Sequence, residues 1–263
     1  MIESELKRAV AERNVILFVG AGVSASLGFP TWNRLIGKLG EELGYNKRLF
    51  PLYGDNLILA EYYALIKGHN PDMSRLLAAE AEWKQKVETS PVFRAIVDLD
   101  CPIIYTTNYD HLLEMAYESA GKAYKRIVDV GDLVGLDPAE TQIVKFHGDY
   151  TVEKSIVLTE SSYFERLDFE SPIDIKFRAD ALGKSILFLG YKLSDINIRL
   201  LLFKLDRLWQ KSNSDNRPRS YIFLPTPNTV QERILESRGI TAIVGEKMDK
   251  TEGLLDFLLN LRD

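Results

Sequence analysis

The sequence predicts an α/β fold, namely a doubly wound, mostly parallel Rossmann-like sheet with an inserted helical module. Short apolar runs bounded by turn signals recur along the 263 residues, as is typical of strands buried on both faces of a sheet. Helical spacing separates most of these runs, and alternation of strand and helix favours a parallel sheet. The runs are NVILFVG (14–20), CPIIYTTN (101–108), KRIVDV (125–130), TQIVKFHG (141–148), SILFLGY (185–191), SYIFLP (220–225) and ITAIVG (240–245).

Residues 33–99 interrupt this alternation, because they contain helical patterns but no strand pattern. We therefore expect an inserted helical module at 33–99 and a Rossmann-like domain made of 1–32 and 100–263. After the last apolar run, only one helical segment follows, at 247–263. We expect no sensor domain in that segment.

Composition limits the possible partners. The net charge of -5 and the pI near 5.4 do not provide the basic surface that neutralises nucleic-acid phosphates. No apolar run approaches the roughly 18 residues of a membrane span, and MIESELKRAVAERN lacks the order of a signal peptide. A single cysteine, Cys101, permits neither an internal disulfide nor a cysteine zinc cluster. We expect a cytoplasmic protein that binds neither membrane nor nucleic acid.

The segment GAGVSA (20–25) follows the first apolar run and precedes a helical pattern. A helix that starts after a buried strand stabilises an anion, and Gly20 and Gly22 would let the backbone approach a pyrophosphate. The alternative is a merely tight turn. An ordinary dehydrogenase needs an acidic residue about 20 positions later at a strand end, but Glu41 and Glu42 lie in the helical module. The segment indicates a nucleotide site of another kind.

Polar residues follow three further runs, where parallel strands deliver side chains to one crevice. Asn108 and Asp110 follow the second run, and His147 follows the fourth. The alternative is that both residues cap the following helix, and Asp110 serves equally well in that role, whereas the position of Asn108, two residues further out, favours a ligand role. A lone histidine is more often structural than catalytic. The fifth run leads to Gly190, Ser194 and Asp195.

Taken in order, GAGVSASLGFP, TTNYD, FHG and LGYKLSD resemble the sirtuins, specifically the sirtuin-like NAD-cleaving proteins of bacterial antiphage systems. The resemblance spans roughly residues 15–200. It implies NAD as substrate, with the GAGVS loop on the pyrophosphate, Asn108 and Asp110 near the nicotinamide ribose, and His147 as catalytic base. The NAD-contacting residues expected from motif and resemblance are Gly20, Ala21, Gly22, Ser24, Thr31, Trp32, Asn108, Asp110, Gly190, Ser194 and Asp195. The expected catalytic residues are Asn108, His147 and Asp110, with no metal.

Departures from the family pattern distinguish its branches. Deacylating sirtuins carry glutamine where this chain has Thr107, phenylalanine and arginine where it has Trp32 and Asn33, and a four-cysteine zinc module that Cys101 alone cannot form. The resemblance therefore disfavours protein deacylation and zinc. It favours NAD hydrolysis to nicotinamide and ADP-ribose, or to a cyclic form. The alternative from another class is a non-catalytic sensor of NAD or an ADP-ribose derivative that gates a partner.

An unrestrained NAD hydrolase would deplete a cofactor that the cell needs. We therefore expect low resting activity, released in a homo-oligomer or in a complex with a separately encoded activating protein. The helical module, with Tyr62, Tyr63 and Trp83, offers one contact surface. The C-terminal helix offers a second, although we expect it to pack on the sheet. Its apolar residues are Leu254, Leu255, Phe257, Leu258, Leu259 and Leu261.

Overall fold

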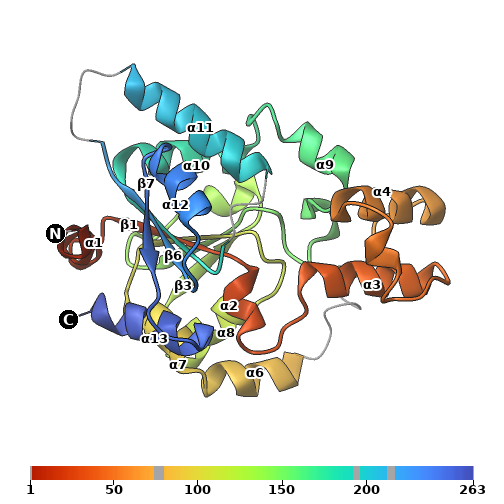
Figure 1. Ribbon diagram of the computed structural model, residues 1–263, viewed down its shortest axis with the longest axis horizontal. Helices are drawn as coiled ribbons and strands as arrows, with labels where there is room; N and C mark the ends of the chain where they lie inside the picture. The colour runs from red at the N-terminus through yellow and green to blue at the C-terminus, as the bar shows by residue number, and fades with distance from the viewer. Residues whose placement is uncertain (1, 74–79, 192–195, 212–216, 263) are drawn as a thin grey trace.

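A seven-stranded, all-parallel sheet forms the centre of the computed structural model, which describes residues 2–73, 80–191, 196–211 and 217–262 (Figure 1). The strand order is β3-β4-β2-β1-β5-β6-β7. Each strand lies in or overlaps one of the expected apolar runs, so the predicted α/β class is confirmed. The strands are β1 (Val15–Val19), β2 (Ile103–Thr106), β3 (Tyr124–Ile127), β4 (Thr141–Lys145), β5 (Ser185–Leu189), β6 (Ser220–Leu224) and β7 (Ile240–Val244).

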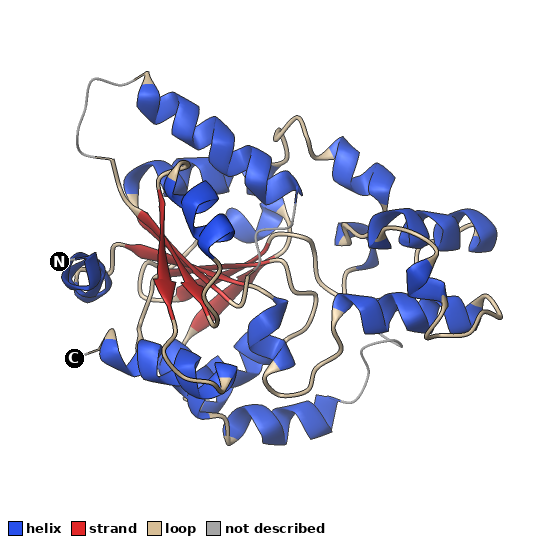
Figure 2. Cartoon of the chain, in the orientation of Figure 1, coloured by secondary structure: helices blue, strands red, loops and turns tan. Residues whose placement is uncertain are grey.

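Helices cover both faces of the sheet (Figure 2). They are α1 (Ile2–Ala11), α2 (Ala21–Ala25), α3 (Trp32–Glu42), α4 (Asn56–Lys67), α6 (Glu80–Glu88), α7 (Pro91–Asp98), α8 (Leu112–Ser119), α9 (Glu160–Glu165), α10 (Pro172–Gly183), α11 (Ile196–Gln210), α12 (Thr229–Glu236) and α13 (Lys250–Asn260). In the described part of the chain, three short 3₁₀ helices lie in the connections: η1 (Phe50–Leu52), η2 (Val130–Leu133) and η3 (Glu153–Ser155). None of the described helices has the length and apolar character that crossing a bilayer requires.

The two faces of the sheet have separate cores, because side chains alternate along a strand. In β1, Leu17 and Val19 pack with residues of α1, α2, α7, α8 and α13. Ile16 and Phe18 point the other way and pack with α10 and α11. The expected burial on both faces holds for the central strands but is wrong for β3 and β7, which are mostly half-buried. These two strands lie at the edges of the sheet, where each has only one neighbour.

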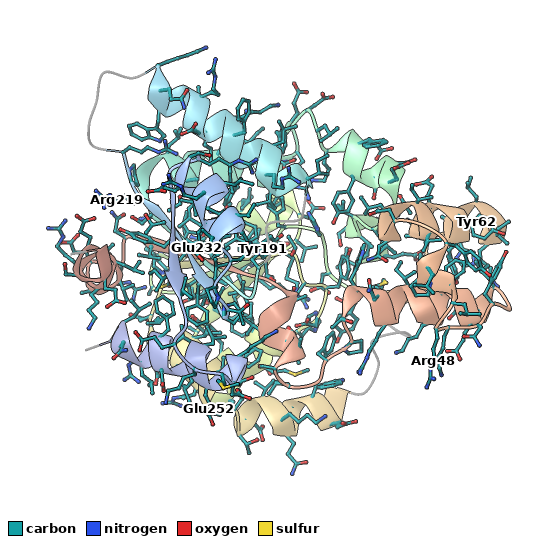
Figure 3. The ribbon with its side chains drawn as sticks, in the orientation of Figure 1. Arg48, Tyr62, Tyr191, Arg219, Glu232 and Glu252 are labelled. Atoms are coloured by element: carbon teal, nitrogen blue, oxygen red, sulfur yellow. The ribbon has the colours of Figure 1, made fainter. Side chains whose placement is uncertain are left out.

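A third cluster of buried apolar side chains joins α3, η1 and α4 into a unit beside the sheet (Figure 1). Tyr62 and Arg48 lie on this unit, far from Tyr191 at the sheet (Figure 3). Glu61 of α4 ties it to α9, because its carboxylate accepts hydrogen bonds of 2.9 Å from both the N–H and the hydroxyl of Ser161.

The helices α6 and α7 pack on the sheet instead, through Val87, Val92 and Phe93 among others. The described part of 33–99 contains no strand, as expected. Its helices are divided, however, because α3 and α4 form the unit beside the sheet and α6 and α7 pack on the sheet itself. The division into an inserted module and a Rossmann-like domain therefore stays a prediction.

The three aromatic residues proposed as a contact surface for a partner differ in solvent exposure. Tyr62 is partly exposed at 36%, whereas Tyr63 is buried, and Trp83 packs against Phe29 with ring centroids 5.0 Å apart. The expected packing of the C-terminal helix on the sheet is confirmed, because apolar residues of α13 and of its C-cap are buried in one of the two sheet cores: Leu254, Phe257, Leu258 and the C-cap Leu261.

Candidate functional site

The turn after β1 packs directly against the turn after β5. Gly20 N–H donates to Leu189 O at 2.8 Å, and Gly22 N–H donates to Gly190 O at 2.9 Å. A Cβ at Gly22 would lie only 2.7 Å from that same oxygen, and Gly190 itself has a φ of +64°. Glycine at these positions is therefore required by backbone packing, a reason that the sequence pattern did not reveal. Contact of Gly20, Gly22 and Gly190 with a ligand stays a prediction.

The sheet order places these turns at a switch point. From β1 the chain passes to β2 on one side, and it later returns to β5 on the other. Ligands of open α/β sheets bind outside the carboxyl ends of the strands at such a point. The helix α2 begins there, and its first two residues, Ala21 and Gly22, are exposed.

Three of the predicted residues form one buried hydrogen-bonded unit. Asn108 Nδ2 donates to Ser24 Oγ at 3.0 Å, and Ser24 Oγ donates to Asp110 Oδ2 at 3.1 Å. All three are at most 8% exposed. At the end of β2, Thr106 Oγ1 donates a hydrogen bond to Val19 O at 2.8 Å and accepts one from the Asn108 N–H at 3.0 Å. These two bonds hold the turn after β2 against β1.

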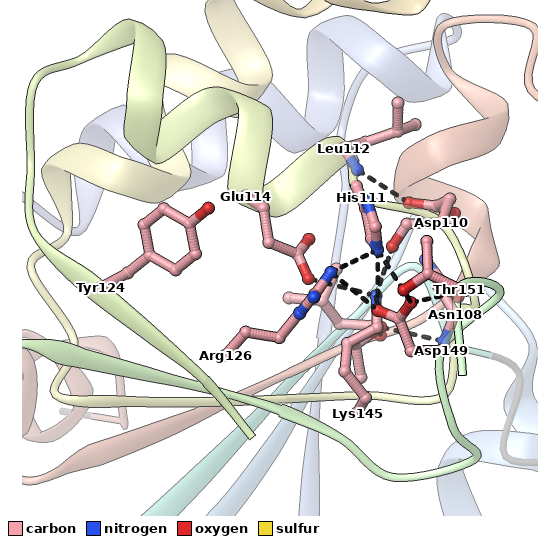
Figure 4. Close-up of polar contacts among 12 residues, drawn as sticks. Asn108, Asp110, His111, Leu112, Glu114, Tyr124, Arg126, Lys145, Asp149 and Thr151 are labelled. Carbon is pink, nitrogen blue, oxygen red and sulfur yellow. Dashed lines mark hydrogen bonds and ion pairs between the residues drawn. The ribbon is translucent and has the colours of Figure 1, made fainter. Parts of the chain in front are cut away.

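Asp110 makes the helix-capping contact that the sequence offered, whereas its contact with a ligand stays a prediction. Its Oδ1 accepts a hydrogen bond of 3.1 Å from the Leu112 N–H at the start of α8 (Figure 4). Its Oδ2 accepts the hydrogen bond from Ser24 Oγ. Burial raises the pKa of Asp110, and the charge of Lys145 and the Leu112 N–H oppose that rise.

His147 occupies the same position relative to β4 as Asn108 does relative to β2. Thr106 and Lys145 are register partners in β2 and β4, so Asn108 and His147 each lie two residues beyond a paired position. The His147 ring is 1% exposed, and its Nδ1 lies 3.2 Å from the Tyr163 hydroxyl of α9. The imidazole is thus oriented by a second side chain, as a general base needs to be.

Two further predicted residues, Thr31 and Trp32, lie at the start of α3. Thr31 is the exposed N-cap of α3, and Trp32, the first residue of that helix, stacks on Tyr109 with ring centroids 6.4 Å apart. Ser194 and Asp195 lie outside the described residues. Tyr191, which was not predicted, donates from its hydroxyl to Thr107 Oγ1 at 3.2 Å and so joins the turns after β5 and β2.

A buried charge cluster beside Asp110 was missed from the sequence. Lys145 Nζ lies 3.3 Å from Glu114 Oε1 and 3.8 Å from Asp149 Oδ2. Asp149 Oδ2 also lies 2.8 Å from His111 Nε2 and 3.5 Å from Arg126 Nη1 (Figure 4). His111 was judged less promising than His147 because it falls in the first turn of an expected helix, yet its Nε2 contacts both Asp149 and Arg126.

The ligand atoms of His111, Glu114 and Asp149 lie within 4.8 Å of one another, a spacing that a metal ion can use. The Lys145 ammonium already lies between Glu114 and Asp149 and supplies a positive charge there. A metal ion would have to displace that ammonium. The geometry therefore fits an ion-pair cluster better than a metal centre.

Comparison with known proteins identifies relatives. A family model described as SIR2-like domain matches residues 102–243. The NAD(+) hydrolase ThsA of Enterococcus faecium is 29% identical over 197 residues, which cover 74% of this chain and 40% of that protein. Defense-associated sirtuin 2 of Bacillus subtilis is 26% identical over 246 residues, covering 91% of this chain and 24% of that protein. The chain thus spans less than half the length of these curated relatives.

Solved structures share the fold. A Sir2 homologue in complex with NAD has a TM-score of 0.51 at 15% identity, covering 100% of this chain and 94% of that one. A Sir2 homologue mutant in complex with ADP-ribose also has a TM-score of 0.51, at 14% identity, covering 100% and 97%. These matches confirm the Rossmann-like architecture, and the sequence relatives confirm the resemblance to sirtuin-like proteins of antiphage defence.

Proposed function

Because the chain belongs to the SIR2-like domain family, we propose that it is an NAD hydrolase that cleaves the nicotinamide–ribose bond. The products would be nicotinamide and ADP-ribose, or a cyclised form of ADP-ribose. The biological role would be in bacterial antiphage defence. The relatives named NAD(+) hydrolase and defense-associated sirtuin support the class. The observation that carries the proposal is the buried Ser24–Asn108–Asp110 unit at the carboxyl edge of the sheet.

The proposed chemistry needs few groups. Nicotinamide leaves as a neutral molecule, so the enzyme needs no general acid and must instead stabilise an oxocarbenium-like ribose. Asp110 would stabilise the developing positive charge, and Asn108 would orient a ribose hydroxyl or the attacking water. His147, held by Tyr163, would accept the proton from that nucleophile.

Release of nicotinamide from NAD by the purified chain, followed by chromatography, tests this proposal. His147→Ala and Asn108→Ala should each lower the rate at least about 100-fold, the usual scale for losing a positioned acid–base group, while ADP-ribose binding persists. His69→Ala is a matched control, because His69 is exposed in the turn after α4. A wild-type chain that binds NAD but never cleaves it would favour a sensor, and active His147→Ala would remove the base assignment.

Assembly and control are further parts of the proposal. We expect a homo-oligomer, or a complex with a separately encoded activating protein, in which cleavage exceeds that of the lone chain. Mass measurement in solution, paired with the cleavage assay across protein concentration, tests this expectation. A monomer at full activity at every concentration would contradict it. The absence of zinc and the cytoplasmic location stay predictions.

A further inference from the structure

Lys145 ends β4 with a side chain that is fully buried. Its ammonium contacts three separate elements (Figure 4). It donates to the main-chain oxygen of Asp110 in the turn after β2, pairs with Glu114 of α8, and lies near Asp149 in the turn after β4. A buried ammonium is costly unless it is paired and hydrogen-bonded, so these contacts fix where the side chain can lie.

Asp149 is itself held rigidly. Its Oδ1 accepts hydrogen bonds from the Thr151 N–H at 2.9 Å and hydroxyl at 2.6 Å, and its Oδ2 lies 2.8 Å from His111 Nε2. Burial alone raises the pKa of Asp149, but the His111 contact, the Lys145 charge and the Thr151 bonds outweigh it and hold that pKa well below its usual range. Lys145 therefore faces a fixed anion.

The contact with Asp110 distinguishes two possible roles for Lys145: neutralising buried carboxylates, or holding the turn after β2 in place. A lysine that only neutralised Glu114 and Asp149 would not need to reach a main-chain oxygen. Among the described residues, neither carboxylate oxygen of Glu114 accepts a hydrogen bond, so Glu114 depends on the ammonium for its only close charge partner. The ammonium, in contrast, also bonds to the segment that carries Asn108 and Asp110.

Resting on the proposed NAD cleavage, we propose that Lys145 is a positioning residue that holds the Asn108–Asp110 turn in register with His147. One ammonium ties together the turns after β2 and β4, which deliver these groups. Removing it takes away the hydrogen bond to the Asp110 main-chain oxygen and the positive charge that lowers the pKa of the Asp110 carboxyl. NAD would still bind, but the reacting groups would be misplaced.

The test compares kcat and KM for nicotinamide release by folded variants. Lys145→Met leaves Glu114 buried without a counter-charge and therefore threatens the fold. The double variant Lys145→Met/Glu114→Gln removes both charges with similar volumes and is the decisive protein. We expect its kcat to fall about 10- to 100-fold, the scale of a small misplacement, with KM nearly unchanged. The acid limb of its kcat profile should move to higher pH, because the Lys145 charge lowers the pKa of Asp110 by more than the Glu114 charge, which is lost with it, raises that pKa.

Two controls separate positioning from general destabilisation. Glu114→Gln removes the same ion pair but leaves the Lys145 contact with Asp110, so its kcat should stay close to that of the wild type. Lys176→Met breaks the ion pair of Lys176 with Asp180, 2.7 Å, within α10, and should also leave kcat unchanged.

Wild-type kcat in the folded double variant would overturn the inference. Equal losses in Glu114→Gln and the double variant would overturn it too, because charge balance would then explain the effect. Failure of the proposed function has a different result, since the wild-type chain would then release no nicotinamide either alone or in its assembled state; that result would refute both proposals. An active wild type with an unaffected double variant would refute only the role of Lys145.

Discussion

Gly22→Ala is the sharpest test of how the turn after β1 is built. The added Cβ would lie 2.7 Å from Gly190 O and 2.9 Å from Gly190 Cα. Both atoms belong to the backbone, so neither can rotate away, and one of the two turns must shift. Overpacking of this kind costs about 1–3 kcal/mol. At about 2–4 °C per kcal/mol for a chain of this size, the melting temperature should fall by about 2–12 °C.

The assay is thermal unfolding followed by circular dichroism, with NAD binding measured by calorimetry on the same preparations. Gly183→Ala is the matched control, because a Cβ at Gly183 meets no atom within 4 Å. Its melting temperature should be unchanged or slightly higher, since alanine is favoured over glycine in a helix. An unchanged melting temperature in Gly22→Ala, with weakened NAD binding, would refute the packing argument and leave ligand approach as the sole reason for glycine.

Three further predictions concern groups away from that turn. The ionised form of Asp149 stabilises the fold above the ordinary carboxyl pKa of about 4, and that stabilisation is lost as the pH falls toward the depressed folded pKa. The difference in unfolding free energy between wild type and Asp149→Asn, measured in urea, should therefore narrow as the solution is acidified; a constant difference would contradict this. Burial raises the pKa of the Cys101 thiol to about 12, so DTNB should modify Cys101 only in denaturant, and rapid labelling of the native chain would count against its burial. EDTA should leave the melting temperature unchanged, because Lys145 supplies the cation among Glu114 and Asp149; a fall reversed by added zinc would reveal a metal site.

The sheet was predictable from the sequence because its central strands are continuous apolar runs between turn signals. Gly20 and Gly22 were recognised as special, but their packing partner Gly190 is far away in the sequence. The contact exists only because β1 and β5 are neighbours in the sheet. A local pattern indicates that glycine is required without indicating what approaches it.

The charge cluster was not predicted for a similar reason. Asp149 meets His111 only because β4 pairs with β2, and neither position has a local signature. One feature of the sequence could have indicated the charge cluster. Lys145 lies two residues after Ile143 and so shares its inward face, and a lysine facing a core needs a carboxylate partner.

The position of β1 in the middle of the sheet governs when the chain can fold during synthesis. Ile16 has no strand partner until Ile103 has been made, and its second partner, Ile186, comes later still. At about 5–20 residues per second, β1 leaves the ribosome roughly 4–17 s before it can pair. Throughout that interval an apolar segment destined for full burial stays unpaired, which is when aggregation competes with folding. The helices between β1 and β2 emerge in the same interval, and contacts between α3 and α4 are local enough to form before the sheet exists.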